Sequence, residues 1–127
     1  MPQTSDLDAR VRNVLTWLEK RGKTAADDQF LSRLPLIERA STDQRNFVKK
    51  GVSWALRAVG RRNSALNTAG VATAIRLISS DSPSARWIGR DAKRELTSPA
   101  VQRQVVKKDA KRARARKKTA VTTVKKR

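Results

Sequence analysis

The sequence predicts an all-α protein, a short stack of antiparallel helix pairs followed by a disordered basic tail. In residues 1–106 the apolar side chains recur at the spacing i, i+3, i+4 and i+7, which indicates amphipathic helices. No stretch alternates between apolar and polar residues as a half-buried strand does. From residue 107 onward basic residues dominate, and Ala and Val are the only apolar ones. Residues 1–106 are therefore predicted to form one helical-repeat domain, and residues 107–127 a disordered Lys/Arg-rich tail.

The first helix is predicted to begin at a capping residue, Ser5 or Asp6, and to end at Gly22. Its apolar stripe consists of Val11, Val14, Leu15 and Leu18. A second helix opens at residue 27 or 28 and carries a stripe of its own. Pro35 lies inside that stripe, and because proline removes a backbone N–H, we expect a late start or a kink there.

Each later helix is preceded by a residue whose side chain can accept a hydrogen bond from the free amides of a first turn. These residues are Thr42 or Asp43, Asn63, Ser82 and Ser98, for helices that end near residues 62, 79, 96 and 106. Pro83 and Pro99 directly follow the two serines, and proline is favoured at the first helical position. The domain is therefore expected to contain about six helices.

The chain carries 30 Lys and Arg against 11 Asp and Glu, a formal net charge of +19. The tail from residue 107 holds eleven of the basic residues, and residues 1–106 are still +9. Like charges repel one another in a compact fold unless a polyanion neutralises them. Nucleic acid is the usual polyanion, and an acidic membrane is the alternative. We expect no membrane partner, because no basic helix carries bulky aromatic residues on its apolar face.

The 127 residues contain no Cys and no His, which excludes disulfides, thiolate nucleophiles, histidine bases and nearly all zinc sites. We therefore expect no metal and no cofactor. Residues 1–8 are polar and acidic, unlike a signal peptide. The longest apolar stretch, 69–78, is interrupted by Thr73 and Arg76 and is not expected to span a membrane. The expected location is the cytoplasm, in association with the nucleoid.

Three of the predicted helices align with one another at an offset of 37 residues. The aligned basic positions are Arg12, Lys49 and Arg86, then Lys20, Arg57 and Arg94, with Thr16, Ser53 and Arg90 between them. Val11, Val48 and Ala85 align among the apolar positions, on the opposite side of the helix. The offset is close to the roughly 40 residues of two-helix solenoid repeats. The alternative is that any two amphipathic helices can be brought into register.

Stacked helices of this kind would expose a basic ridge. Each cation on it can neutralise a phosphate and release a condensed counterion, so binding to nucleic acid would depend steeply on salt. Arg57 and Arg94 can also hold two phosphate oxygens at once. Trp17 and Trp54 fall at the border between the ridge and the core. A tryptophan there either stacks on a base or sugar or covers the core, and for Trp54 both interpretations stay open.

No catalytic arrangement stands out in the sequence. Phosphate-binding loops rich in glycine are absent. Asp91 is a weak candidate for an acid, one turn after Trp87 on the same helix face. It is flanked by Arg90 and Arg94, and a surface salt bridge is the favoured interpretation.

Five runs of residues carry a resemblance to a known family. They are LPLIERA (34–40), RNFVKKGVSWALR (45–57), GRRN (60–63), ARWIGRDA (85–92) and EL (95–96). Over residues 30–104 the chain resembles the C-terminal part of the bacterial DNA alkylation repair family, the alkylpurine DNA glycosylases built from HEAT-like repeats. A further run, VLTWLEKRG (14–22), resembles the extreme N-terminus of that family.

The resemblance implies a right-handed α-solenoid that holds DNA on a concave basic surface, in a family that excises positively charged alkylated purines. The family's chemistry depends on a Trp-x-x-x-Asp carboxylate and an arginine in the middle of the chain. That middle is absent here, so the resemblance implies a truncated, internally deleted member without glycosylase activity of its own. The run from Trp87 to Asp91 has the catalytic spacing but lies in the C-terminal match, so no catalytic role is transferred. A role in lining the DNA surface is transferred to Trp54, and to Arg57 in the same run.

We therefore expect a DNA-binding helical-repeat protein whose partner is duplex DNA, alkylated DNA included. The expected DNA-binding residues are Lys49, Lys50, Ser53, Trp54, Arg57, Arg61, Arg86, Arg90 and Arg94, with the tail adding sequence-blind affinity. Two alternatives stay open: an active alkylpurine DNA glycosylase with Asp91 as its acid, and a non-enzymatic RNA- or ribosome-associated protein. Because a short stack leaves its end repeats uncovered, weak self-association is a further expectation.

Overall fold

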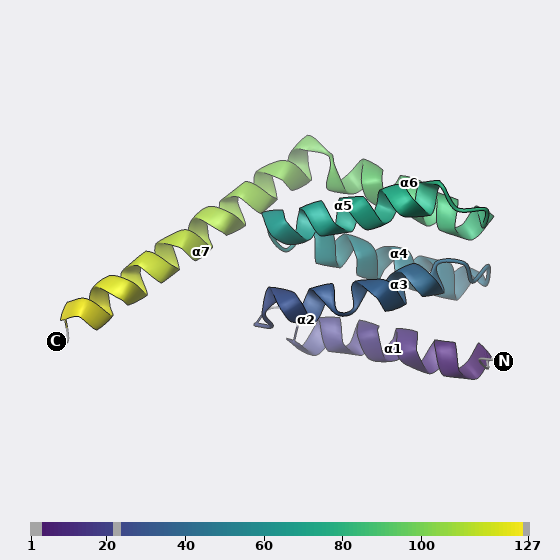
Figure 1. Cartoon of the computed structure of the whole chain (residues 1–127), viewed down its shortest axis with the longest axis horizontal. Helices are drawn as coiled ribbons and strands as arrows, with labels where there is room; N and C mark the ends of the chain where they lie inside the picture. The colour runs from purple at the N-terminus through teal and green to yellow at the C-terminus, as the bar shows by residue number, and fades with distance from the viewer. Residues whose placement is uncertain (1–3, 22–23, 126–127) are drawn as a thin grey trace.

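The chain forms helices joined by short turns (Figure 1). In this computed structural model the backbone is described for residues 4–21 and 24–125, and the side chains for residues 9–21 and 24–117. The helices within these ranges are α1 (Thr4–Arg21), α2 (Asp27–Leu31), α3 (Leu34–Ala40), α4 (Asn46–Gly60), α5 (Ser64–Ile78), α6 (Pro83–Leu96) and α7 (Pro99–Lys125). Gly22, the predicted end of the first helix, lies outside the described residues.

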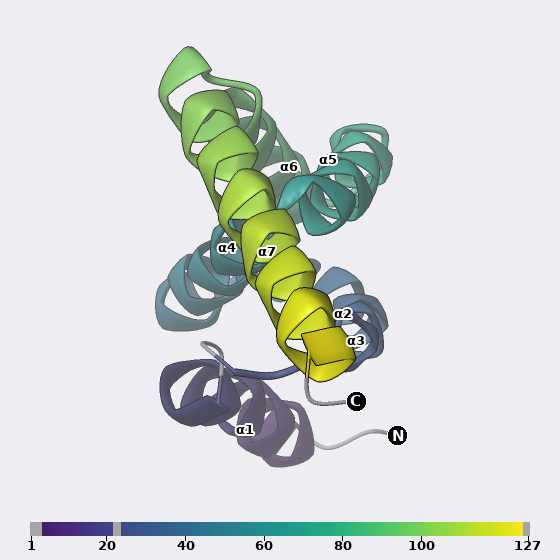
Figure 2. The same ribbon diagram turned by 90° about the vertical axis from the view of Figure 1, so that its left-hand side faces the viewer.

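Two layers of helices make up the body of the protein (Figure 2). Helices α1, α4 and α6 lie side by side and run in the same direction, while α2, α3 and α5 form the other layer and run back. Within the first layer α1 packs on α4, and α4 packs on α6. The predicted all-α stack of antiparallel helix pairs is confirmed.

The 37-residue offset marks equivalent positions in α1, α4 and α6. The aligned side chains of Val11, Val48 and Ala85 are all buried in the core. Glycines let neighbouring helices approach closely. A Cβ atom on Gly51 would lie 3.3 Å from Leu15 Cδ1 of α1, and one on Gly89 would lie 2.6 Å from the carbonyl oxygen of Ala74 in α5. The small residues therefore set the spacing between the helices.

Helix ends follow most of the predicted signals. The side chains of Asn63, Ser82 and Ser98 accept hydrogen bonds from the backbone N–H groups of Leu66, Ala85 and Val101. The break between α2 and α3 falls just before Pro35, as expected for a residue without an N–H. The helix predicted to follow a cap at Thr42 or Asp43 begins later, because α4 starts at Asn46, so that prediction is wrong. Asp43 instead accepts hydrogen bonds from the backbone N–H and the guanidinium of Arg45.

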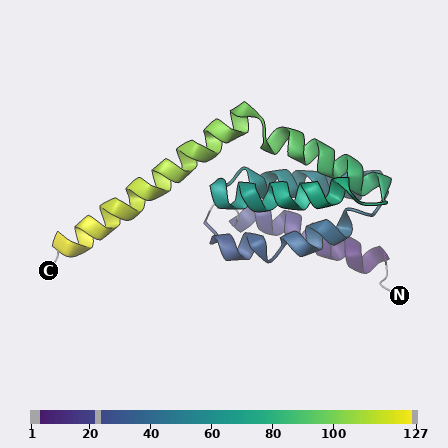
Figure 3. The same cartoon turned by 45° about the horizontal axis from the view of Figure 1, so that its top comes forward.

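The basic tail differs from the prediction. Residues 107–125, expected to be disordered, continue α7 as a helix, and residues 126–127 lie outside the described part. Val101 and Val105 pack against Leu96 and fix the first turns of α7 on the stack. Because Ala, Lys and Arg are all strong helix formers, the helix can continue without an apolar stripe. The distal part of α7 projects away from the stack (Figure 3).

A buried amide joins the last four helices at one point. The Asn67 Nδ2 atom of α5 donates to the carbonyl oxygens of Gly60 and Leu96, at 3.0 Å each. Its Oδ1 atom accepts from Gln102 Nε2 of α7 at 3.2 Å. Because a buried polar group left unpaired is costly, these bonds fix where α7 leaves α6. The path that α7 takes across the end of the stack is set at this point.

Candidate nucleic-acid interface

The outer side of α4 and α6 carries the predicted binding residues. Side chains three or four positions apart share one side of a helix, and here that side points away from the core. We call the following residues the α4–α6 face: Lys49, Lys50, Trp54, Arg57 and Arg61 of α4, and Arg86, Trp87, Arg90 and Arg94 of α6, all wholly or partly exposed. Arg12 and Lys20 of α1 are also exposed and extend the same pattern to a third helix.

Glu95 holds two of the arginines on this face. Arg57 Nη1 donates to Glu95 Oε1 at 3.2 Å, and Arg61 Nη1 lies 3.3 Å from Glu95 Oε2. Both ion pairs join α4 to α6. The charges of Arg57 and Arg61 are therefore partly neutralised by the protein itself.

Asp91 is engaged in the same way. Its carboxylate accepts hydrogen bonds from Arg94 Nη2 at 2.7 Å and from the Ser53 hydroxyl at 3.1 Å, and Arg57 Nε lies 3.9 Å away. Ser53 is only 1% exposed, so its hydroxyl serves Asp91 and does not reach a ligand on the surface. The geometry agrees with the interpretation of Asp91 as a salt-bridged residue.

Two cations of the face point into solvent. Within the described side chains, Lys50 and Arg90 are exposed and make no hydrogen bond or ion pair. Arg86 is different, because its Nη1 donates to the carbonyl oxygens of Ser80 and Asp81 and so fixes the turn before α6. A phosphate group meets no competing protein partner at Lys50 or Arg90.

The two tryptophans singled out by the sequence have different environments. Trp54 is 37% exposed on the outer side of α4. Trp17 packs edge-on against Phe30 of α2, with ring centroids 5.0 Å apart. Trp17 thus covers the core, whereas Trp54 offers part of its ring to a ligand.

Trp87 was missed as a candidate binding residue. Its ring is 41% exposed, and Lys49 Nζ lies 4.4 Å from the ring centroid. The signal was present in the sequence, because Trp87 stands three and seven residues before Arg90 and Arg94 and so shares their helix face.

A second basic surface lies where α7 crosses the end of the stack (Figure 2). Three contacts hold α7 there: Lys108 Nζ to the Arg61 carbonyl oxygen at 2.8 Å, the Ser64 backbone N–H to Asp109 Oδ1 at 3.1 Å, and Arg112 Nη1 to Asp27 Oδ1 at 3.5 Å. These contacts join α7 to the corner between α4 and α5 and to the start of α2. The basic helix is therefore docked over part of its length.

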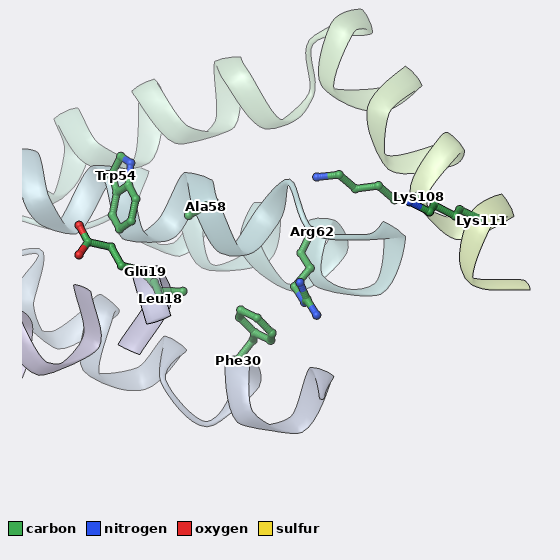
Figure 4. A pocket seen from close by; sticks show the side chains of 8 residues that line it. All are labelled: Leu18, Glu19, Phe30, Trp54, Ala58, Arg62, Lys108 and Lys111. Carbon is green, nitrogen blue, oxygen red and sulfur yellow. The ribbon is translucent and has the colours of Figure 1, made fainter. Parts of the chain in front are cut away.

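Between α7 and the stack is an open pocket of about 540 Å³, which we call the α7 cleft (Figure 4). It is lined by Leu18, Glu19, Phe30, Trp54, Ala58, Arg62, Lys108 and Lys111. Trp54 and Glu19 face each other at one end, and the two lysines reach in from α7 at the other. The cleft thus has an aromatic end and a cationic end.

Burial and like charge act on the cationic end. Loss of water around Lys108, and then the nearby charges of Arg61 and Arg62, hold the pKa of its ammonium below the ordinary value of 10.5. Burial likewise lowers the pKa of Arg62. An anion bound between these groups would relieve the repulsion.

Within residues 4–21 and 24–125, no helix is long and apolar enough to cross a bilayer. Among the side chains that the structure describes, no group of three or more acidic residues is placed to share a metal ion.

Comparison with known proteins gave one match. Residues 6–96 match the family model described as DNA alkylation repair enzyme. The matched range begins in α1 and ends with α6, so it contains the α4–α6 face and excludes α7. Neither a curated protein nor a solved structure matched the chain.

Proposed function

Because the chain belongs to the DNA alkylation repair enzyme family, we propose that it is a repair protein that binds duplex DNA on the α4–α6 face. The observation that carries the proposal is the alignment of cations from successive helices on that face, with Trp54 and Trp87 partly exposed among them. Seven cations stand there against two carboxylates, Asp91 and Glu95. The net field is positive and attracts the phosphate backbone.

Binding begins at the cations that have no protein partner. Phosphates contact Lys50 and Arg90 without breaking an ion pair, and each contact releases a counterion into solution. The rings of Trp54 and Trp87 provide flat apolar surface for sugars and bases. Contacts of this kind position the protein on DNA without reading base sequence.

The test compares two exposed arginines, Arg90 and Arg39. Arg90→Gln removes a cation from the α4–α6 face, and Arg39→Gln removes an exposed arginine of α3 in the other layer. The slope of log K against log salt for duplex DNA is negative, and we expect Arg90→Gln to reduce its magnitude by about 0.9, the loss of one phosphate contact. Arg39→Gln is expected to leave the slope unchanged. Equal losses for both variants would show that only the overall charge matters.

We further propose that the chain is a truncated family member without autonomous glycosylase activity. In support, Asp91 is held by Arg94 and Ser53 and so is not free to act on a substrate. We expect no release of 7-methylguanine from alkylated duplex DNA. Release that Asp91→Asn abolished would establish the enzyme alternative instead.

The proposed setting is the cytoplasm, on the nucleoid. Competition at one fixed salt concentration between duplex DNA and structured RNA of equal length separates this setting from the ribosome-associated alternative. We expect duplex DNA to compete at least as well as RNA. A clear preference for RNA would favour the alternative.

A further inference from the structure

The α7 cleft offers a kind of site that the α4–α6 face does not. Its cationic end is lined by Lys108 and Lys111 of α7 and by Arg62 of the stack, whose side chain points toward Phe30, and at its other end Trp54 forms a wall. The two lysines lie outside the range that matches the family, which ends at residue 96. The site therefore exists only because α7 docks on the end of the stack.

The three cations stand where two pockets meet. A second pocket, of about 290 Å³, is also lined by Arg62, Lys108 and Lys111, together with Asn63, Arg112 and Ala115. A ligand whose anionic group is held by these cations can therefore extend into either pocket.

Arg62 is fixed in place before any ligand arrives. Its Nη2 donates to the carbonyl oxygen of Ala25 at 2.9 Å, and its guanidinium lies 4.5 Å from the centroid of the Phe30 ring. A cation held in this way loses little freedom when it binds an anion.

The carboxylates near the three cations are already engaged. Asp109 accepts from the Ser64 backbone N–H, and Asp27 accepts from Asn63 Nδ2 at 2.9 Å and pairs with Arg112. Glu19 lies at the opposite end of the cleft, beside Trp54. The cleft is therefore positive at one end and aromatic with a negative edge at the other, which orients a ligand that has an anionic and a ring-shaped part.

We propose that the α7 cleft binds an unpaired nucleotide, with its phosphate between Arg62, Lys108 and Lys111 and its base toward Trp54. The volume lies in the range of about 300–1,000 Å³ that is typical of small-ligand sites, so it admits a nucleotide or two but no double helix. Stacking on Trp54 tolerates any base. The site goes beyond duplex binding on the α4–α6 face, because it takes a single strand or a free nucleotide.

Fluorescence anisotropy with a labelled short oligothymidylate tests the site in the full chain. We expect Lys111→Gln to weaken binding about tenfold and to lower the salt slope by about 0.7, the value for one phosphate of a single strand. Lys117→Gln is the matched control, because it removes the same charge from the same helix farther along the chain. It is expected to weaken binding less than about twofold.

The ring end and the source of the nucleotide are tested separately. Trp54→Leu is expected to weaken oligothymidylate binding while leaving the affinity for pyrophosphate unchanged. Binding of dTMP alone, followed by calorimetry, identifies a free nucleotide as sufficient, and binding of oligothymidylate only identifies a strand. Equal losses in Lys111→Gln and Lys117→Gln, or no binding of either ligand, would overturn the proposal. Loss of duplex binding in Arg90→Gln leaves this outcome unaffected, so the two proposals fail independently.

Discussion

Single carboxylates decide which cations of the α4–α6 face are available. Arg57 and Arg61 both approach Glu95 within 3.3 Å. A phosphate that takes either arginine must compete with a carboxylate already in place, and the net gain is correspondingly small. Lys50 and Arg90 face no such competitor among the described side chains. The positions of the acidic residues therefore determine which basic residues of the face are available to phosphate.

Two glycines test the packing of single residues. A Cβ on Gly89 would lie 2.6 Å from the Ala74 carbonyl oxygen and 2.9 Å from Ile78 N, and these backbone atoms cannot move aside locally. We expect Gly89→Ala to lower the free energy of unfolding by about 1–3 kcal/mol in urea denaturation. Gly51→Ala is the control, because its Cβ meets only the tip of Leu15 at 3.3 Å. There the better helix propensity of alanine offsets the contact, so a loss at Gly51 as large as that at Gly89 would contradict the packing argument.

Among the described helices, α7 is attached to the stack most unevenly along its length. Its first turns are buried through Val101 and Val105, its middle is joined to the stack by side-chain contacts, and its distal part projects. A helix with this profile opens progressively from its far end. The α7 cleft therefore depends on polar contacts more than on burial.

The contact between Asp109 and Ser64 predicts a dependence of α7 docking on pH. Hydrogen bonds from Ser64 hold the pKa of Asp109 below its ordinary value of 3.8. The ionised carboxylate therefore stabilises docking above that pH, and the contribution is lost as the pH falls through the lower pKa of the folded state. We expect Asp109→Asn to lose less stability than the wild-type chain on acidification through this range, measured by thermal unfolding.

Asp81→Asn is the control for this titration. Among the described contacts the Asp81 side chain makes no hydrogen bond, so its variant is expected to keep the acid dependence of the wild-type chain. If Asp109→Asn and Asp81→Asn reduced the loss of stability on acidification equally, the contact between Asp109 and Ser64 would not be the cause of that loss.

For the whole molecule, the net charge of +19 sets stability and binding against each other. Repulsion among the cations opposes the compact state, whereas the same cations attract DNA. The charge also opposes contact between two copies of the chain, and self-association stays a prediction.

Salt should therefore act in opposite directions on the two properties. Raising the ionic strength from about 0.01 M to about 0.1 M shortens the screening length from about 30 Å to about 10 Å. We expect the unfolding temperature of the free protein to rise by a few degrees while its affinity for duplex DNA falls. At fixed salt, duplex DNA should raise the unfolding temperature because it binds the folded state. A free protein destabilised by salt would contradict the view that repulsion limits its stability.

The features that could be predicted are those written in short-range patterns or in the 37-residue repeat. The helical spacing and the caps at Asn63, Ser82 and Ser98 follow from neighbouring residues, and the alignment of α1, α4 and α6 follows from the repeat. The burial of Ser53 could not be predicted, because it depends on how closely α6 approaches α4. The helix over residues 107–125 has no apolar stripe to indicate it, and it rests instead on the helix propensity of Ala, Lys and Arg. The α7 cleft joins residues from α1, α2, α4 and α7, and no sequence pattern relates such distant positions.

The contacts between neighbouring repeats recur at nearly one sequence separation. Asn63 bonds to Asp27, Arg57 to Glu95 and Arg76 to Glu38, at separations of 36, 38 and 38 residues. Contacts between residues about one repeat apart thus join neighbouring units in both layers of the stack. In a stack of this kind each unit contacts only its neighbours, so the effect of a change in one unit passes along the chain one repeat at a time.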